Sequence, residues 1–537
     1  MKYFKQIITA ILFMSIGLPG LFAQTKPAVT GDPVRIVEIL PGARKLEYRK
    51  IDSLTELQIL VGNVKLKQGT TLFFCDSCVI NNFQHTFEAF GNIHIEDDTT
   101  DVYSNYLRYL TDKKIAYLTG NVRLTDGKGT LTTNDLEYDV NTGIGIYRKG
   151  GKVVNKKTVL NSEEGYYYSD IKDVYFKKDV QLKDPSFRLS SDSLLYNTQT
   201  ETARFIAETF ITDTNNRTII TKEGFYNIQT GKAEFGQNPV INDGAVRITA
   251  LRIALDDSTG ISQAEGNAVV VDTAQGTTIL AGVIFRNNKT QSLLATRKPL
   301  MIIKQDEDSI YIAADTLFSA RLTDLYSTTD SVVVDTLKNM TTVSANDKDS
   351  TNRYFEAFRN VRIFSDSLQA ASDSLFYSFR DSTFRLYQSP VIWANKSQIT
   401  GDTIYLFTKN KKADRMQVFE NSLLVNEVQP QIFNQIAATR MDGYFVDGNI
   451  DSVRARGFAQ SIYFLQEEDS SFSGINETTS DILDIYFKNQ ELQKVVFRSA
   501  VNGTLWPIRQ KNPGEMRLKN FIWLEDRRPK TKFELFE

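Results

Sequence analysis

The sequence LVGNVKL at residues 60–66 recurs as AFGNIHI at residues 89–95 and as LTGNVRL at residues 118–124. The glycines of the three copies, Gly62, Gly91 and Gly120, lie 29 residues apart. Weaker copies of the same step follow near residues 178–182, 264–270, 357–363, 388–392 and 420–424. A fixed period of this length is typical of repeat folds, in which one unit cannot bury its apolar face alone and stacks on its neighbours.

A second motif lies about midway between these steps, as SDSLLY at residues 191–196 and SDSLFY at residues 372–377. Both motifs alternate apolar with polar residues, which is the period of a β-strand. A Gly-Asn pair within a strand indicates a bend or a bulge. Because convincing helical periodicity is absent, we predict an all-β array of roughly fifteen units of about 29 residues each.

The second motif repeats an aspartate, at Asp192, Asp315, Asp373 and Asp402. Two carboxylates could serve glycoside hydrolysis, but their recurrence in unit after unit favours turn residues where strands begin. No P-loop, HExxH or nucleophile-elbow motif is present. Two His and two Cys leave few groups for acid–base, thiol or metal chemistry. We therefore expect no enzyme activity, no cofactor and no metal site.

The two cysteines, Cys75 and Cys78, combine with His85 and His94 into a superficial resemblance to a zinc site. The spacings are irregular, which argues against zinc. A disulfide between Cys75 and Cys78 is an alternative in an oxidising compartment. It requires a local turn, because residues three apart on a strand point to opposite faces. Otherwise both cysteines are ordinary strand residues.

The N-terminus carries a targeting pattern. Two lysines in residues 1–5 precede an apolar run from Ile7 to Phe22, and Ala23 offers a small residue before Gln24. This predicts a cleavable secretory signal peptide, with an uncleaved anchor as the alternative. The formal net charge of −2 argues against a nucleic-acid partner. The expected organisation is a signal peptide at 1–23, an extended lead-in at 24–42, the repeat array at 43–502 and a tail at 503–537.

The two coupled motifs together resemble the OstA/LptA family of lipopolysaccharide transport proteins, and more narrowly the long OstA-like proteins of Bacteroidetes-type Gram-negative bacteria. The resemblance implies a twisted, open β-jellyroll, in which two sheets form a V around an apolar groove. It also implies that the groove binds the lipid A part of lipopolysaccharide, with inner- and outer-membrane components of like fold as partners. End-to-end self-association and two or more consecutive OstA-like domains are further expectations, and the expected location is the periplasm.

The residues expected to line this groove are the inward-facing apolar residues of the two motifs. They are Phe87, Ala89, Ile93, Ile95, Leu118, Val122, Leu124, Leu136, Tyr138, Val361, Ile363, Leu375 and Tyr377. The alternative is that they fill a closed sandwich core, because a sandwich alternates in the same way. The leading function is a lipopolysaccharide carrier. A scaffold of the cell envelope that binds no lipid, or a secreted carbohydrate-active β-solenoid enzyme, are the alternatives.

The tail combines aromatic and basic residues, among them Trp506, Trp523, Arg527 and Arg528. We consider two interpretations of this composition. One is a strand that docks a partner or contacts lipid phosphates, and the other is a solvated, disordered end.

Overall fold

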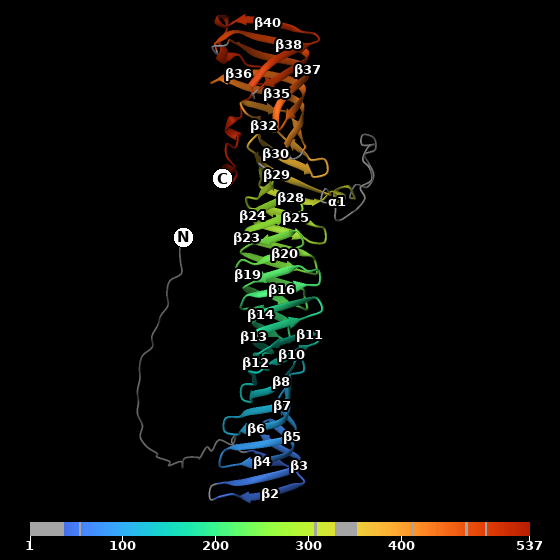
Figure 1. The fold of residues 1–537 in the computed structure, drawn as a ribbon, viewed down its shortest axis with the longest axis vertical. Coiled ribbons are helices and arrows are strands. Elements are labelled where there is room, and N and C mark those ends of the chain that lie inside the picture. Colours follow the sequence, from blue (N-terminus) through green and yellow to red (C-terminus); the bar gives the residue numbers. More distant parts are fainter. Residues whose placement is uncertain are drawn as a thin grey trace, which may run out of the picture.

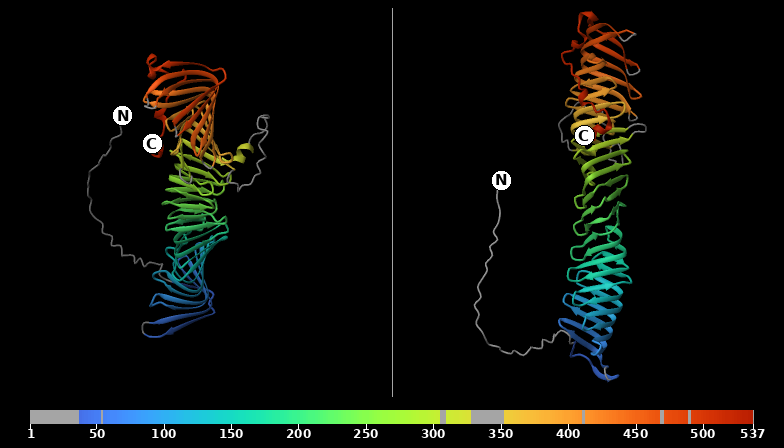
Figure 2. Two further views of the ribbon diagram at one scale, coloured as in Figure 1. Left: turned by 45° about the horizontal axis from the view of Figure 1, so that its top comes forward. Right: turned by 90° about the vertical axis from the view of Figure 1, so that its left-hand side faces the viewer.

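The computed structural model describes residues 37–52, 55–304, 309–327, 352–409, 412–467, 471–488 and 491–536. These residues form forty strands and very little helix, so the predicted all-β fold class is confirmed. The strands build one long column, with the first strands at one end and the last at the other (Figure 1). The column stays narrow in the other views (Figure 2). The predicted signal peptide at 1–23 lies outside the described residues.

Long strands cross the column from one layer to the other at their middle. They are β3 (Glu56–Gln68), β4 (Thr71–Asn81), β5 (Thr86–Asp97), β6 (Thr100–Leu110), β7 (Ile115–Thr125), β8 (Thr130–Asp139), β13 (Asp173–Lys183), β14 (Phe187–Asn197), β23 (Ile261–Asp272), β24 (Thr277–Asn287), β29 (Arg353–Phe364), β30 (Gln369–Ser378), β35 (Lys412–Gln429), β36 (Ile432–Val446), β37 (Asn449–Gln466) and β38 (Phe472–Lys488). One half of each strand pairs in layer 1 and the other half in layer 2.

Short strands lie in one layer only. Layer 1 holds β2 (Lys45–Lys50), β9 (Ile144–Tyr147), β12 (Glu164–Tyr168), β15 (Thr202–Phe205), β18 (Glu223–Asn227), β19 (Lys232–Gly236), β22 (Arg252–Asp256), β25 (Ser292–Thr296), β28 (Thr316–Arg321), β31 (Thr383–Tyr387), β34 (Thr403–Lys409) and β39 (Glu491–Arg498). Layer 2 holds β1 (Glu38–Leu40), β10 (Gly151–Asn155), β11 (Thr158–Ser162), β16 (Thr209–Asp213), β17 (Thr218–Thr221), β20 (Val240–Asp243), β21 (Val246–Thr249), β26 (Leu300–Lys304), β27 (Ser309–Ala313), β32 (Val391–Ala394), β33 (Ser397–Thr400) and β40 (Asn502–Pro507).

All neighbouring strands in these two layers pair antiparallel, as in β5 with β6 and β12 with β13. Each layer stacks roughly 28 strands, which at about 4.8 Å per strand makes a column on the order of 130 Å long. The layers face each other closely: the rings of Phe73 in layer 2 and Phe87 in layer 1 lie 5.3 Å apart.

The Gly-Asn step marks the place where a strand leaves one layer for the other. In the β5–β6 pair, Phe90 faces Tyr106 and Ile93 faces Ser104, so Gly91 and Asn92 together oppose a single residue. Gly91 and Asn92 have φ angles of 75° and 43°, a left-handed conformation that Gly and Asn adopt at low cost. The predicted bulge is therefore confirmed. The weaker copies keep this left-handed pair with other residues, at Lys178-Asp179, Gln388-Ser389 and Glu420-Asn421.

The second motif lies in the strand that returns opposite this bulge. The hydroxyls of Ser104, Ser191 and Ser372 each donate to the carbonyl two residues further on, at 3.2, 3.0 and 3.0 Å. At this hydrogen bond the strand changes which of its two faces points into the interior. Ser104 and Leu107 are three residues apart, and both point into the interior.

The prediction that the recurrent aspartates are strand-entry turn residues is wrong for two of them. Asp192 and Asp373 lie within β14 and β30, at the crossing. Asp315 and Asp402 directly precede β28 and β34, and each accepts hydrogen bonds from the asparagine of a neighbouring bulge.

These bonds show that the two sequence motifs are one structural device. The amide of Asn360 donates to Asp315 at 3.1 Å and that of Asn421 to Asp402 at 3.1 Å. Asn92 donates in the same way to Asp76, at 2.9 Å. The motifs therefore meet across neighbouring strands rather than alternate as independent signals.

The helical segments are short. They are α1 (Leu322–Ser327), η2 (Ile508–Gln510), η3 (Pro513–Glu515), η4 (Glu525–Arg527) and η5 (Lys532–Phe536). Among the described residues, no helix has the length and apolar composition that crossing a membrane requires.

The expectation of a solvated C-terminal end is wrong. Residues 502–507 form β40 on β38, and the chain then turns back along the outer face of layer 2 (Figure 1). Phe521 and Trp523 pack against Phe433, with ring centroids 5.3 and 5.0 Å away. Arg528 donates to Gln369 at 2.7 Å. These aromatic and basic residues of the tail therefore contact the β-strands of the chain's own array.

Candidate ligand cleft between the two layers

The interior between the layers is apolar and continuous. One core cluster of buried side chains runs from Leu60 to Phe487 without leaving the two layers. All thirteen residues predicted to line the groove belong to it, with 0% to 8% of their surface exposed. Within residues 87–95 the buried side chains are Phe87, Ala89, Ile93 and Ile95, as the alternation predicts. Whether any of them contacts lipid stays a prediction.

The crossings form the closed side of the V, and the hairpin turns of the two layers form two rows on the opposite side. Over residues 68–201, polar contacts join these rows. Gln68 in layer 2 donates to the carbonyl of Thr111 in layer 1 at 2.9 Å. The hydroxyl of Tyr138 donates to Asp97 at 2.9 Å, and Asn155 donates to the carbonyl of Thr198. In this part of the column the two rows are therefore fastened together.

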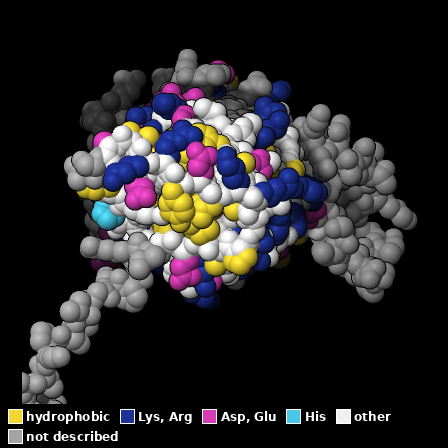
Figure 3. All heavy atoms as spheres, turned by 90° about the horizontal axis from the view of Figure 1, so that it is seen from below, with side chains coloured by type: hydrophobic (Ala, Val, Ile, Leu, Met, Phe, Trp, Pro, Cys, Tyr) yellow, Lys and Arg dark blue, Asp and Glu magenta, His cyan; other side chains and the backbone are white. Residues whose placement is uncertain are grey.

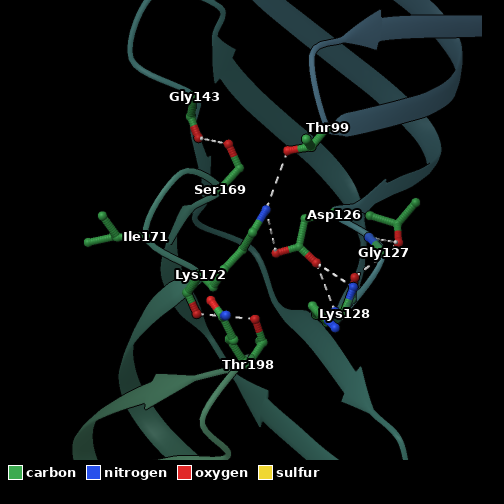
Figure 4. A network of polar contacts seen from close by, with 12 residues as sticks. Thr99, Asp126, Gly127, Lys128, Gly143, Ser169, Ile171, Lys172 and Thr198 are labelled. Atoms are coloured by element: carbon green, nitrogen blue, oxygen red, sulfur yellow. Dashed lines mark hydrogen bonds and ion pairs between the residues drawn. The ribbon is translucent and has the colours of Figure 1, made fainter.

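An ion pair, here called the Lys172 bridge, also joins the two rows (Figure 4). Lys172 lies in a layer-1 turn, and its Nζ reaches Asp126 Oδ2 at 3.6 Å and the hydroxyl of Thr99 at 3.4 Å in two layer-2 turns. The Asp126 side chain is 0% exposed. Its other oxygen accepts the backbone N–H groups of Lys128 and Gly129, each at 2.9 Å.

The two rows separate between residues 186 and 379 and enclose a cavity of about 930 Å³. Its walls are apolar side chains from both layers, among them Phe187, Ile219, Phe235, Leu255, Val270 and Ile279. Its rim is charged, with Arg217, Asp243, Asp257, Asp272, Arg286 and Arg353. An apolar chamber with a charged rim suits a ligand that has both apolar and polar parts.

Two ion pairs cross the rim from one layer to the other. Arg217 Nη2 lies 3.1 Å from Asp257 Oδ1, and Arg286 Nη1 lies 3.0 Å from Asp243 Oδ2. Tyr226 donates its hydroxyl to Asp257 at 3.0 Å, and burial followed by the charge of Asp257 raises the pKa of Tyr226. These pairs are partly exposed, so separating one costs little compared with opening a packed core.

None of the thirteen predicted residues lines the cavity. Some of the cavity residues come from segments that keep the alternation but lack the Gly-Asn step, such as residues 209–221 and 252–256, and Val270 comes from the unit with Gly266 and Asn267. The alternation signals their inward faces. Nothing local in the sequence shows that the two rows of turns separate there.

The cysteines are free thiols, and both are buried. The expectation that they point to opposite faces is wrong, because the change of face at the crossing in β4 falls between them. A hydrogen bond with Cys75 and burial raise the pKa of the Cys78 thiol. The disulfide stays a prediction.

The histidines do not join the cysteines. His94 faces outward, with its ring 4.4 Å from that of Tyr103 and its Nε2 2.7 Å from Asp101. In the part of the chain that the structure describes, no group of three or more His, Cys, Asp or Glu side chains could hold a metal ion.

The fold and the cleft define a class, an elongated two-layer β-array with an enclosed apolar interior. Residues 39–192 match the family model described as OstA-like protein. The resemblance to the OstA-like family is thereby confirmed over these residues.

The other comparisons add little. No curated protein matches the chain. Among solved structures, the chain is similar to LptH of Pseudomonas aeruginosa, described as the LptA homologous periplasmic component of the lipopolysaccharide transport device. That match is 11% identical, covers 27% of this chain and 82% of that chain, and has a TM-score of 0.20.

Proposed function

We propose that the protein is a non-enzymatic carrier that shields the acyl chains of lipopolysaccharide between its two layers during transport to the outer membrane. The observation that carries the proposal is the apolar interior, continuous along the column and widened into the 930 Å³ cavity. The OstA-like match over residues 39–192 supports the same class of ligand.

The physical reason for such an interior is the cost of hydrating lipid chains. Moving one twelve-carbon chain into water costs on the order of 10 kcal/mol, at about 0.8 kcal/mol per CH₂. A lipid with several chains therefore cannot cross an aqueous compartment unshielded. A column on the order of 130 Å long lowers that cost along the whole route. The cross-rim pairs Arg217–Asp257 and Arg286–Asp243 are the contacts that a ligand entering from the side must displace.

The proposed location is the periplasm, reached through the signal peptide at 1–23, and the proposed organisation is the lead-in, array and tail given above. The proposed partners are membrane components of like fold and further copies of the chain. The first strands support end-to-end docking, because Leu46 and Tyr48 on β2 are 45% and 61% exposed. Seen from this end, hydrophobic side chains lie among Lys and Arg side chains (Figure 3).

A scaffold of the cell envelope that binds no lipid is the second candidate. The contacts that fasten the two rows of turns over residues 68–201 favour it, since they leave that part of the interior packed with the chain's own side chains.

A photo-crosslinking residue separates the two candidates. It is placed in living cells at Ile219, which lines the cavity, or at Ile220, the next residue of β17 on the opposite face. The carrier predicts lipopolysaccharide adducts at Ile219 and none at Ile220. A second pair, Ile93 and Asn92, reports on the closed part of the column. Absence of adducts at both Ile219 and Ile93, in protein that is exported and resists protease, would reject the carrier.

A further inference from the structure

One partly buried cation at the rim of the cavity forms no ion pair with a carboxylate of the described residues. Arg353 is the first residue of β29 and lines the cavity. Its guanidinium donates to the carbonyl of Gln291 at 3.1 Å and to the hydroxyl of Ser319 at 3.0 Å. Both acceptors are neutral. Among the described residues, no carboxylate forms an ion pair with Arg353.

The other arginines of the rim differ from Arg353 in this respect. Arg217 and Arg286 pair with Asp257 and Asp243 across the rim. Arg321 pairs with Asp324 at 3.0 Å. Burial, the largest effect, lowers the pKa of the Arg353 guanidinium. The charge of Asp272 raises this pKa, the charges of Arg286 and Arg321 lower it, and that of Asp324 raises it. Carboxylates thus act on Arg353 only through space, from Asp272 and Asp324, and none forms an ion pair with it among the described residues.

Arg353 also lies next to apolar residues of the cavity wall. Leu293 on β25 pairs with Ser319, the residue that accepts from Arg353. Phe379 donates its backbone N–H to the carbonyl of Arg353 at 3.1 Å. Both Leu293 and Phe379 line the cavity. A ligand group bound at Arg353 therefore continues directly into apolar surroundings.

A guanidinium has five N–H donors in a planar fork that matches phosphate, and two of them are used here by neutral acceptors. A charge withdrawn from water without a counter-ion is unfavourable, and an anionic ligand group relieves that cost. Charge-assisted hydrogen bonds of this kind are roughly twice as strong as neutral ones.

We propose that Arg353 forms an anion subsite at this end of the cavity, and that the subsite takes a phosphate group of an amphiphilic ligand whose apolar part fills the cavity. The subsite deepens the proposed carrier function and rests on it for the apolar part of the ligand. Arg286 and Arg321, each paired with an aspartate, lie beside the subsite together with Asp272.

The test compares bisphosphorylated lipid A with its fully dephosphorylated form, in binding titrations with the full chain. Wild-type protein is expected to bind the phosphorylated form roughly tenfold tighter or more, since one charged hydrogen bond is worth about that factor. Arg353→Met keeps an unbranched apolar stem and is expected to abolish the difference while leaving the affinity for the dephosphorylated form unchanged. Arg353→Lys is expected to retain part of the difference in affinity between the two lipid forms. Arg204→Met is the control, because Arg204 is exposed on the outer face of β15.

A separate arm uses inorganic phosphate alone, observed by phosphorus NMR line broadening that depends on Arg353. Lipid binding without phosphate discrimination and without Arg353-dependent broadening would overturn the subsite and leave the carrier intact. Equal weakening of both lipid forms in Arg353→Met would mean a structural role, which also overturns it. Arg353-dependent phosphate binding without any lipid binding would support the subsite and reject the carrier.

Discussion

Removing the ammonium group of the Lys172 bridge should loosen the two rows of turns. In Lys172→Met the Asp126 carboxylate, whose side chain is 0% exposed in the wild type, keeps its two backbone N–H donors but loses its cation. Breaking a buried ion pair from one side leaves an uncompensated charge and costs about 3–5 kcal/mol. Lys172 itself is 16% exposed and 3.6 Å away, so we expect the lower end of that range, about 3 kcal/mol.

The double variant Asp126→Asn, Lys172→Met separates charge from packing. The asparagine oxygen still accepts from Lys128 and Gly129, and no charge is left unpaired. We expect it to recover roughly 1–2 kcal/mol of the loss. Lys149→Met is the matched control, because Lys149 pairs with Asp135 at 3.7 Å, nearly the same distance, but is 76% exposed. An exposed pair contributes about 0–1 kcal/mol.

Amide hydrogen exchange is the suitable assay, because a long repeat array opens locally rather than as a whole. A loss of about 3 kcal/mol is roughly a hundredfold faster exchange, which we expect in β7, β8 and β13 around the bridge. Exchange in β36, far along the column, should not change. Equal exchange in Lys172→Met and Lys149→Met, or no recovery in the double variant, would refute the reasoning.

Three further predictions concern the crossings, the acidic limit of stability and the thiols. Gly91→Ala should destabilise the crossing by about 1–2 kcal/mol or more, because the added Cβ would lie 2.4 Å from Asp76 Oδ2 at a φ of 75°. The control is Gly69→Ala, whose Cβ meets nothing within 4 Å at a φ of 63°. Local hydrogen exchange compares the two variants. Hydrogen bonds from Arg454 hold the pKa of Asp484 below its ordinary value, with Arg498 adding to the effect. Its contribution is therefore present at neutral pH and lost as pH falls through that lowered pKa, so the difference in urea midpoint between wild type and Asp484→Asn should shrink in acid and not in alkali. In the folded protein both cysteines should react slowly with iodoacetamide at neutral pH and fast in urea; reaction in urea only after reduction would instead establish the disulfide.

Much of the local structure could be predicted from the sequence because its causes are local. Gly91 and Asn92 are two residue types that tolerate left-handed backbone, and two such residues within an alternating strand leave a bulge as the consistent solution. The inward face of residues 87–95 follows from the same alternation.

Other features could not be predicted from the sequence because they depend on residues in a second strand. The role of Asp315 depends on Asn360, which lies 45 residues away and donates to it across the sheet. The shared face of Cys75 and Cys78 depends on the crossing opposite them in β5. Trp523 packs against apolar side chains around Phe433 on the outer face of the array. Period-two alternation does not predict that this outer face is apolar.

The sequence by itself determined the repeated motifs, the all-β class and the Gly-Asn bulges, since each rests on residues that are neighbours along the chain or one unit apart. The tertiary structure alone decided where the column is closed and where it holds a cavity. That depends on the separation of two rows of turns, and each contact across it, from the Lys172 bridge to Arg217–Asp257, joins residues about 40 or more positions apart. A pair such as Lys172 and Asp126 cannot be recognised in the sequence, because the two side chains form an ion pair only when folding brings their turns to the same level of the column.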